Sequence, residues 1–217
     1  MSPGLARRIQ GLVTRTVRVV GNAARDDLAR DRTTLADHRG EVTVGYFGYL
    51  SPAWFDWDLI GELARRRPTW SFQIAGYGEP AGLALPPNVR LLGRQPSTTL
   101  GSLATGWDVG IVPFRQGAVA EAADPIKVYE YLALGLPVVT CGAPPPPETE
   151  RFVKQAEGVE AVLAALVGFR EMGDATERRR LAGTLSWGSR VTDLLTVAEE
   201  AWKRIDSATS EGTELWR

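Results

Sequence analysis

Lys127 and Glu130 are the side chains whose types and spacing could do chemistry, because a helix would place them one turn apart on one face. Asp124 and Pro125, just before them, are typical of a helix start, where a carboxylate can cap exposed N–H groups and proline fits the first turn. A helix N-terminus beside a lysine suits phosphate, and a carboxylate one turn further along can accept hydrogen bonds from sugar hydroxyls. The pattern therefore allows a nucleoside-diphosphate site. It also allows a surface ion pair on an ordinary amphipathic helix, and the spacing alone favours that simpler interpretation.

These two side chains must be positioned by a helix that leads into a buried strand. Apolar residues recur every three to four positions from 126 to 133, which predicts one apolar helix face. Gly135 is typical of a helix end, and Pro137 restarts the chain as the β-branched run 138–141. The single cysteine, Cys141, lies in this predicted buried strand, so we expect a packed thiol rather than a nucleophile.

Along the rest of the chain, runs typical of strands alternate with helical patterns. We expect strands at 42–48, 69–76, 89–93, 108–114, 138–141 and 151–156, with helices at 58–67, 97–105, 158–169, 174–185 and from 186 onward. This alternation predicts an α/β fold with a doubly wound, Rossmann-like parallel sheet of about six strands and extra C-terminal helices. Such sheets bind ligands at the carboxyl ends of their strands. Neither a Gly-x-Gly-x-x-Gly helix opening nor a Walker P-loop pattern is present, which disfavours nicotinamide and P-loop domains.

The chain divides into three predicted parts. Residues 1–40 form a basic N-terminal helix and linker, residues 41–185 a Rossmann-like domain, and residues 186–217 a C-terminal helix with a frayed tail from Asp206 onward. The expected first helix is amphipathic through Leu5, Ile9, Leu12 and Val13. A basic amphipathic helix can face a partner or lie on anionic lipid, so peripheral membrane contact is one expectation.

Composition narrows the class of protein. A net charge of −1 gives no broad positive field, so we expect no nucleic-acid partner. A lone cysteine excludes an internal disulfide and fits a reducing compartment, and the single histidine, His38, excludes a multi-histidine metal site within this chain. No apolar run is long enough to span a membrane, and the start lacks a secretory h-region, so we expect a cytoplasmic location.

The stretch Asp124–Val139 reads D-P-I-K-V-Y-E-Y-L-A-L-G-L-P-V-V. It resembles the donor-site segment of GT-B glycosyltransferases, in particular the family 4-like group of polysaccharide biosynthesis, which carries (Asn/Asp)-Pro-(Ile/Leu)-Lys-x-x-Glu-Tyr-Leu-Ala-x-Gly-x-Pro-Val-Val. Shorter similarities lie at Val17–Asn22, at Gly45–Gly48, at Trp54–Asp56 and at Asp108–Phe114. The resemblance runs from about Val17 to about Arg204 and covers only the C-terminal half of the family's usual chain.

This resemblance implies a domain that binds a nucleotide-diphosphate-sugar donor and needs no cofactor or metal. UDP is one candidate nucleotide, and the sequence leaves the base and the sugar open. Glu130 would hydrogen-bond the ribose hydroxyls, and Lys127 would offset the diphosphate charge, so both are the candidate catalytic residues. The residues implied to bind the donor are Gly45, Phe47, Gly48, Arg94, Asp124, Pro125, Ile126, Lys127 and Glu130. Arg94 would stack on a base or reach a phosphate, although a plain surface arginine is the simpler interpretation.

The sequence departs from the family's pattern in three ways. Ala122 stands where many members have a glutamate, Leu50–Trp54 lacks the usual arginine and lysine, and the acceptor-binding half is absent. Three interpretations therefore stay open. The chain is the donor half of a glycosyltransferase that works with a separate acceptor-binding domain or chain, a non-catalytic module with a degenerate site, or an unrelated α/β ligand-binding domain.

Overall fold

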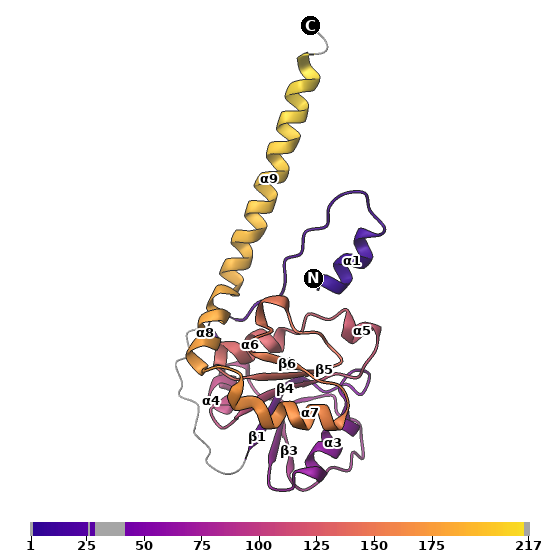
Figure 1. Ribbon diagram of the computed structural model, residues 1–217, viewed down its shortest axis with the longest axis vertical. Helices are drawn as coiled ribbons and strands as arrows, with labels where there is room; N and C mark the ends of the chain where they lie inside the picture. Colours follow the sequence, from indigo (N-terminus) through magenta and orange to yellow (C-terminus); the bar gives the residue numbers. More distant parts are fainter. Residues whose placement is uncertain (1, 26, 29–41, 215–217) are drawn as a thin grey trace.

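The computed structural model describes residues 2–25, 27–28 and 42–214, and its centre is one parallel sheet (Figure 1). The strand order is β3-β2-β1-β4-β5-β6, with every neighbouring pair parallel. The strands are β1 Thr43–Tyr49, β2 Ser71–Tyr77, β3 Val89–Gly93, β4 Val109–Pro113, β5 Val138–Cys141 and β6 Val153–Gln155. This order reverses between β1 and β4, which confirms the predicted doubly wound sheet and places its crevice at the carboxyl ends of those strands.

Helices cover both faces of the sheet, and each face has its own core. The bounds are α1 Pro3–Gln10, α3 Trp57–Arg66, α4 Leu100–Ala104, α5 Ala118–Glu121, α6 Ile126–Leu134, α7 Val159–Val167, α8 Ala175–Thr184 and α9 Trp187–Glu214. Side chains of α3 and α7 pack on one face around Ile60, Ile111 and Leu166. Side chains of α4, α6 and α8 pack on the other face around Leu132. All five residues of β4 are buried, as expected for a parallel strand that is covered on both sides.

Helix α6 is fixed at its C-terminal end by a glycine and by two arginines. Gly135 adopts the left-handed conformation, with φ of 86°, and its N–H donates to the carbonyls of Leu132 and Tyr131. From α8, Arg178 Nε donates to Gly135 O at 2.7 Å, and Arg179 Nη2 donates to Leu134 O at 3.1 Å. Burial lowers the pKa of Arg178 to about 10, so the guanidinium stays charged at neutral pH and complements the negative end of the helix dipole.

The two ends of the chain differ from the sequence-based expectation. Helix α1 ends at Gln10 because Gly11 follows as its C-cap, so Leu12 and Val13 lie beyond the helix rather than on its apolar face. Helix α9 projects away from the sheet (Figure 1), and its backbone stays helical to Glu214 instead of fraying from Asp206. No proline interrupts that stretch, which is a physical reason for the continuation. Most of the predicted linker, including His38, lies outside the described residues.

Gly45 lies in the middle of β1, directly beneath the Trp107 ring. A Cβ added at Gly45 would fall 1.9 Å from Cδ2 of that ring, so no larger residue fits without moving the indole. Trp107 is fully buried, stacks near Phe47 and donates from Nε1 to Gln73 Oε1 at 3.0 Å. The packing of Trp107 is therefore a sufficient structural reason for glycine at position 45.

We predict that Gly45→Ala lowers the free energy of unfolding by at least about 2 kcal/mol, because the methyl group overpacks the core against Trp107. Urea denaturation followed by tryptophan fluorescence measures this loss. The matched control is Gly183→Ala in α8, where nothing lies within 4 Å of the added Cβ. That control should be neutral or stabilise by up to about 1 kcal/mol. Equal effects of the two substitutions would contradict the packing argument.

Candidate functional site

A cavity of about 210 Å³ opens at the carboxyl ends of β1, β2 and β3, on the face that α4 and α6 cover. Its lining residues are Phe47, Gly48, Tyr49, Ala75, Gly76, Tyr77, Arg94, Gln95, Ser97, Leu100 and Lys127. Four of these, namely Phe47, Gly48, Arg94 and Lys127, are residues that the sequence analysis selected for donor binding. They come from three separate stretches of the chain, and the sheet brings them to one edge.

Lys127 and Glu130 form a largely buried ion pair at the start of α6. Lys127 Nζ lies 2.8 Å from Glu130 Oε2, and the Glu130 side chain is only 5% exposed, against 22% for Lys127. The same ammonium lies 4.6 Å from the centre of the Phe47 ring, which attracts it through a cation–π interaction. Lys127 lines the cavity, whereas Glu130 lies behind it, so the pair points its positive member toward the open space.

The N-terminal end of α6 is not capped as the sequence predicted. Pro125 occupies the N-cap position, and no side chain among the described residues accepts a capping hydrogen bond there. Asp124 was expected to supply the cap, but its carboxylate accepts from Asn22 N–H at 2.7 Å and from Tyr129 O–H at 2.9 Å. In the first turn, Val128 N–H donates to Pro125 O at 3.0 Å, so it is the N–H groups of Ile126 and Lys127 that lack a partner within the helix and suit an anion.

Two aromatic contacts hold the floor and rim of the cavity. Phe47 N–H donates to Tyr131 Oη at 3.0 Å, and the two rings meet edge to face at 4.9 Å. Complete burial raises the pKa of the Tyr131 hydroxyl well above its usual value, so the hydroxyl stays neutral. At the rim, the Arg94 guanidinium lies over the Tyr77 ring at 5.0 Å. Arg94 is thus exposed to solvent, and its side chain also forms part of the cavity wall.

The remaining predicted residues lie near the cavity without forming its wall. Gly45 is covered by Trp107, while Asp124, Pro125, Ile126 and Glu130 flank or underlie Lys127 at the start of α6. Their roles toward a ligand stay predictions. Sequence reasoning did not select Tyr49, Gly76 and Tyr77, which line the cavity from the ends of β1 and β2. The position of these residues at the carboxyl ends of predicted strands was the available signal.

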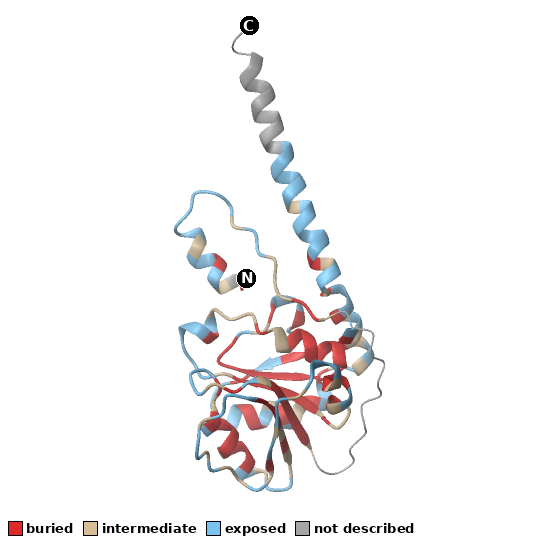
Figure 2. Ribbon diagram, turned by 180° about the vertical axis from the view of Figure 1, so that it is seen from behind, coloured by how far each residue is buried: buried red, intermediate tan, exposed pale blue. Residues whose placement is uncertain are grey.

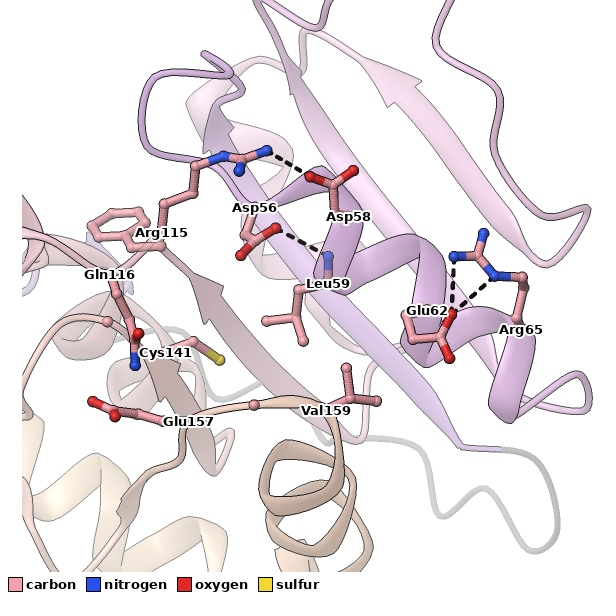
Figure 3. Close-up of a pocket in the computed structure, with 13 residues that line it drawn as sticks. Asp56, Asp58, Leu59, Glu62, Arg65, Arg115, Gln116, Cys141, Glu157 and Val159 are labelled. Carbon is pink, nitrogen blue, oxygen red and sulfur yellow. Dashed lines mark hydrogen bonds and ion pairs between the residues drawn. The ribbon is translucent and has the colours of Figure 1, made fainter.

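A larger hollow of about 660 Å³ lies on the opposite face, between α3 and α7 (Figure 3). Most of the charged side chains that line it are already engaged in hydrogen bonds or ion pairs within the protein. Asp56 caps α3 by accepting from Leu59 N–H, Asp58 pairs with Arg115 at 3.0 Å, and Glu62 pairs with Arg65 at 3.0 Å. Because these groups are engaged and the predicted residues lie elsewhere, we place the candidate site in the smaller cavity.

Cys141 borders the larger hollow and is a buried free thiol, which confirms the prediction of a packed cysteine. Burial raises the pKa of this thiol to about 12. We predict that iodoacetamide at pH 8 alkylates the folded protein far more slowly than the urea-unfolded protein, because the thiolate is the reactive form. Mass spectrometry of timed samples measures this difference. Equal rates in the two states would contradict the burial of Cys141.

We predict that Lys127→Ala lowers the free energy of unfolding by about 3 kcal/mol, because it leaves the carboxylate of Glu130 buried without its cation. Chemical denaturation measures the effect, and a double-mutant cycle with Glu130→Gln isolates the pairing energy. The comparison variant is Arg65→Ala, which breaks a pair whose arginine side chain is 59% exposed and should matter much less. A Lys127→Ala effect as small as that of Arg65→Ala would show that the pair is not effectively buried.

The sheet order and the edge site define a doubly wound domain of the kind found in GT-B glycosyltransferases. The chain matches the model of the family described as glycosyl transferases group 1 over residues 41–171, more than half of its length. The chain therefore belongs to this family. That match confirms the resemblance first carried by the segment Asp124–Val139.

Individual relatives agree with this assignment. The chain is 28% identical over 173 residues to a putative teichuronic acid biosynthesis glycosyltransferase, TuaH, of Bacillus subtilis strain 168, covering 73% of this chain and 43% of the relative. It is similar in fold to the S. aureus TarM G117R mutant in complex with fondaparinux, alpha-GlcNAc-glycerol and UDP, with a TM-score of 0.61, 15% identity and coverage of 90% and 42%. It also resembles a chain of the GtfA/B complex, with a TM-score of 0.59, 13% identity and the same coverage. The chain thus spans less than half the length of each.

Two further findings concern membranes and metals. In the part of the chain that the structure describes, no helix combines the length and apolar character needed to cross a bilayer. Within the same described residues, no three His, Cys, Asp or Glu side chains come together in a way that could hold a metal ion.

Proposed function

We propose that this chain is the donor-binding half of a glycosyltransferase and binds a nucleoside-diphosphate sugar, UDP-linked in the first instance, at the cavity beside α6. The observation that supports this most is the Lys127–Glu130 pair at an uncapped helix N-terminus, on the rim of a cavity at the sheet's carboxyl edge. Cation, helix dipole and open N–H groups all favour a diphosphate at one place. The TarM structure, a fold relative, holds UDP.

The proposed chemistry is stabilisation of a leaving group. In sugar transfer, the bond between the anomeric carbon and the diphosphate oxygen breaks, and the oxygen keeps the electron pair. Lys127 and the first-turn N–H groups of α6 would stabilise that growing negative charge. Glu130 holds the ammonium at the cavity wall and would accept hydrogen bonds from the ribose hydroxyls once Lys127 turns toward phosphate. This role requires no metal.

We further propose that an acceptor-binding half, either on another chain or in a longer form of this one, completes the site. The chain covers about 43% of its curated relative, and one similar structure is a two-protein complex, GtfA/B. Helix α9 offers a surface for such a partner. Large apolar side chains are exposed along it at Trp187, Val191, Leu194, Leu195 and Trp202, on a helix that stands clear of the sheet (Figure 2). Exposed apolar stripes of this kind mark interaction surfaces.

The alternative is a non-catalytic module with a degenerate site, and two observations favour it. Ala122 carries no carboxylate at a position where the resembling group often has one. The loop that follows β1, from Leu50 to Trp54, carries no cation toward the cavity rim. Such a module would regulate or support a partner and would bind nucleotide weakly.

Nucleotide binding separates these proposals. Calorimetry and thermal shift with UDP, GDP, dTDP and ADP should show one preferred diphosphate, and a ligand at about 100 times its dissociation constant should stabilise the fold by about 2.7 kcal/mol. Glu130→Gln keeps the size of the side chain and removes its charge, so it should lose most of that binding. Glu62→Gln, in the larger hollow, is the control and should bind like the wild type. Absence of binding to all four nucleotides would favour the non-catalytic module.

A further inference from the structure

Asp124 connects the start of α6 to a distant part of the chain. Its Oδ2 accepts from Asn22 N–H at 2.7 Å, and its own carbonyl accepts from Asn22 Nδ2 at 2.6 Å. Its Oδ1 accepts from Tyr129 O–H, one turn into α6, at 2.9 Å. Both carboxylate oxygens are therefore engaged, although neither touches the N–H groups of the helix that the residue precedes.

The segment that holds Asp124 is itself anchored on the far side. Arg190, at the start of α9, donates from Nε to Asn22 O at 3.2 Å, and Ala24 N–H donates to Leu185 O at 3.2 Å. Ala23 and Ala24 are completely buried. Residues 21–24 thus lie between the start of α6 and the junction of α8 with α9, hydrogen-bonded to both, and we call them the strap.

The strap determines what the Asp124 carboxylate can do. A free aspartate one residue before the N-cap can turn back and accept from first-turn N–H groups, which is the ordinary behaviour of acidic residues at a helix start. Here Asn22 and Tyr129 occupy both oxygens, and the cap position is left to Pro125. A docked strap therefore engages both carboxylate oxygens in fixing the start of α6 and leaves the first-turn N–H groups to a diphosphate.

We propose that Asp124 is a positioning residue that couples docking of the strap to nucleoside-diphosphate binding at α6. This inference rests on the proposed donor site and adds how that site is kept available. When the strap is docked, the helix N-terminus is open to phosphate. When the strap leaves, the start of α6 loses this anchor, and Lys127 and the first-turn N–H groups are no longer held in place for phosphate. The strap continues directly from residues 2–20. A partner that contacts those residues would therefore change the affinity for the donor through the strap.

Such a linkage must act in both directions. If a docked strap raises the affinity for UDP, bound UDP must stabilise the docked strap by the same factor. The Asn22 amide reports this directly, because its hydrogen is held by Asp124 Oδ2. Hydrogen exchange at Asn22 should therefore slow when UDP binds, although Asn22 does not line the cavity.

The test compares UDP affinity and Asn22 amide exchange in the wild type and three variants. Simple electrostatics predicts that Asp124→Ala, which removes a negative charge beside an anion site, strengthens UDP binding. Coupling predicts the opposite sign, a loss of about tenfold, because the strap is released and α6 loses its fixed start. Asn22→Ala keeps the carboxylate but loses one strap bond, so it should weaken UDP binding in the same direction. Asp27→Asn removes the charge of a carboxylate that pairs with Arg25 near the strap but does not contact Asn22 or Asp124, so it should leave UDP binding unchanged.

The proposal is supported if both Asp124→Ala and Asn22→Ala weaken UDP binding and if UDP slows Asn22 exchange in the wild type and in Asp27→Asn but not in Asp124→Ala. It is overturned if Asp124→Ala binds UDP as tightly as the wild type or more tightly, or if UDP leaves Asn22 exchange unchanged. Those results would leave the donor site intact as long as wild-type binding is still lost in Glu130→Gln. If the wild type binds no UDP, the donor site and the coupling both fail.

Discussion

The C-terminal end of helix α6 is closed by Gly135 and two arginines of α8, whereas its N-terminal end carries no side-chain cap from any residue that the structure describes. The helix dipole places its positive end at this uncapped N-terminus, near the sheet's carboxyl edge. The Lys127–Glu130 pair is neutral as a whole, but it places its ammonium at the cavity and its carboxylate behind the lysine. Because α6 is held firmly at its C-terminal end, its uncapped N-terminal end can stay in place for a ligand.

Tight packing of aromatic rings on glycines keeps that edge rigid. Trp107 lies against Gly45, and Tyr131 lies so close to Gly110 that an added Cβ would fall 2.6 Å from its ring. Tyr131 then receives the N–H of Phe47, whose ring supports Lys127. The cation is therefore positioned by a chain of contacts that begins in the centre of the sheet. Loss of any ring would disturb the site as well as the core.

The fold and the central segment could be predicted from the sequence because they depend on local patterns. The spacing of apolar residues, together with Gly135 and Pro137, predicted α6 and the strand that follows it. The alternation of strand and helix patterns predicted the sheet. The capping role of Asp124 was predicted wrongly because its partner, Asn22, is 102 positions away in the chain, and no local rule reports a distant N–H group. Tyr77 follows a predicted strand, which was a signal for the carboxyl edge of the sheet, but the sequence did not give the order of β1, β2 and β3 that brings it to the cavity lined by Lys127.

The central claim is that a nucleoside diphosphate binds at the open end of α6, and a crystal structure of the chain grown with UDP tests it most directly. The account predicts diphosphate oxygens within hydrogen-bond distance of the Lys127 ammonium and of the first-turn N–H groups, with the ribose toward Glu130. Density for UDP in the larger hollow beside Asp58 and Arg115, with the small cavity empty, would contradict it.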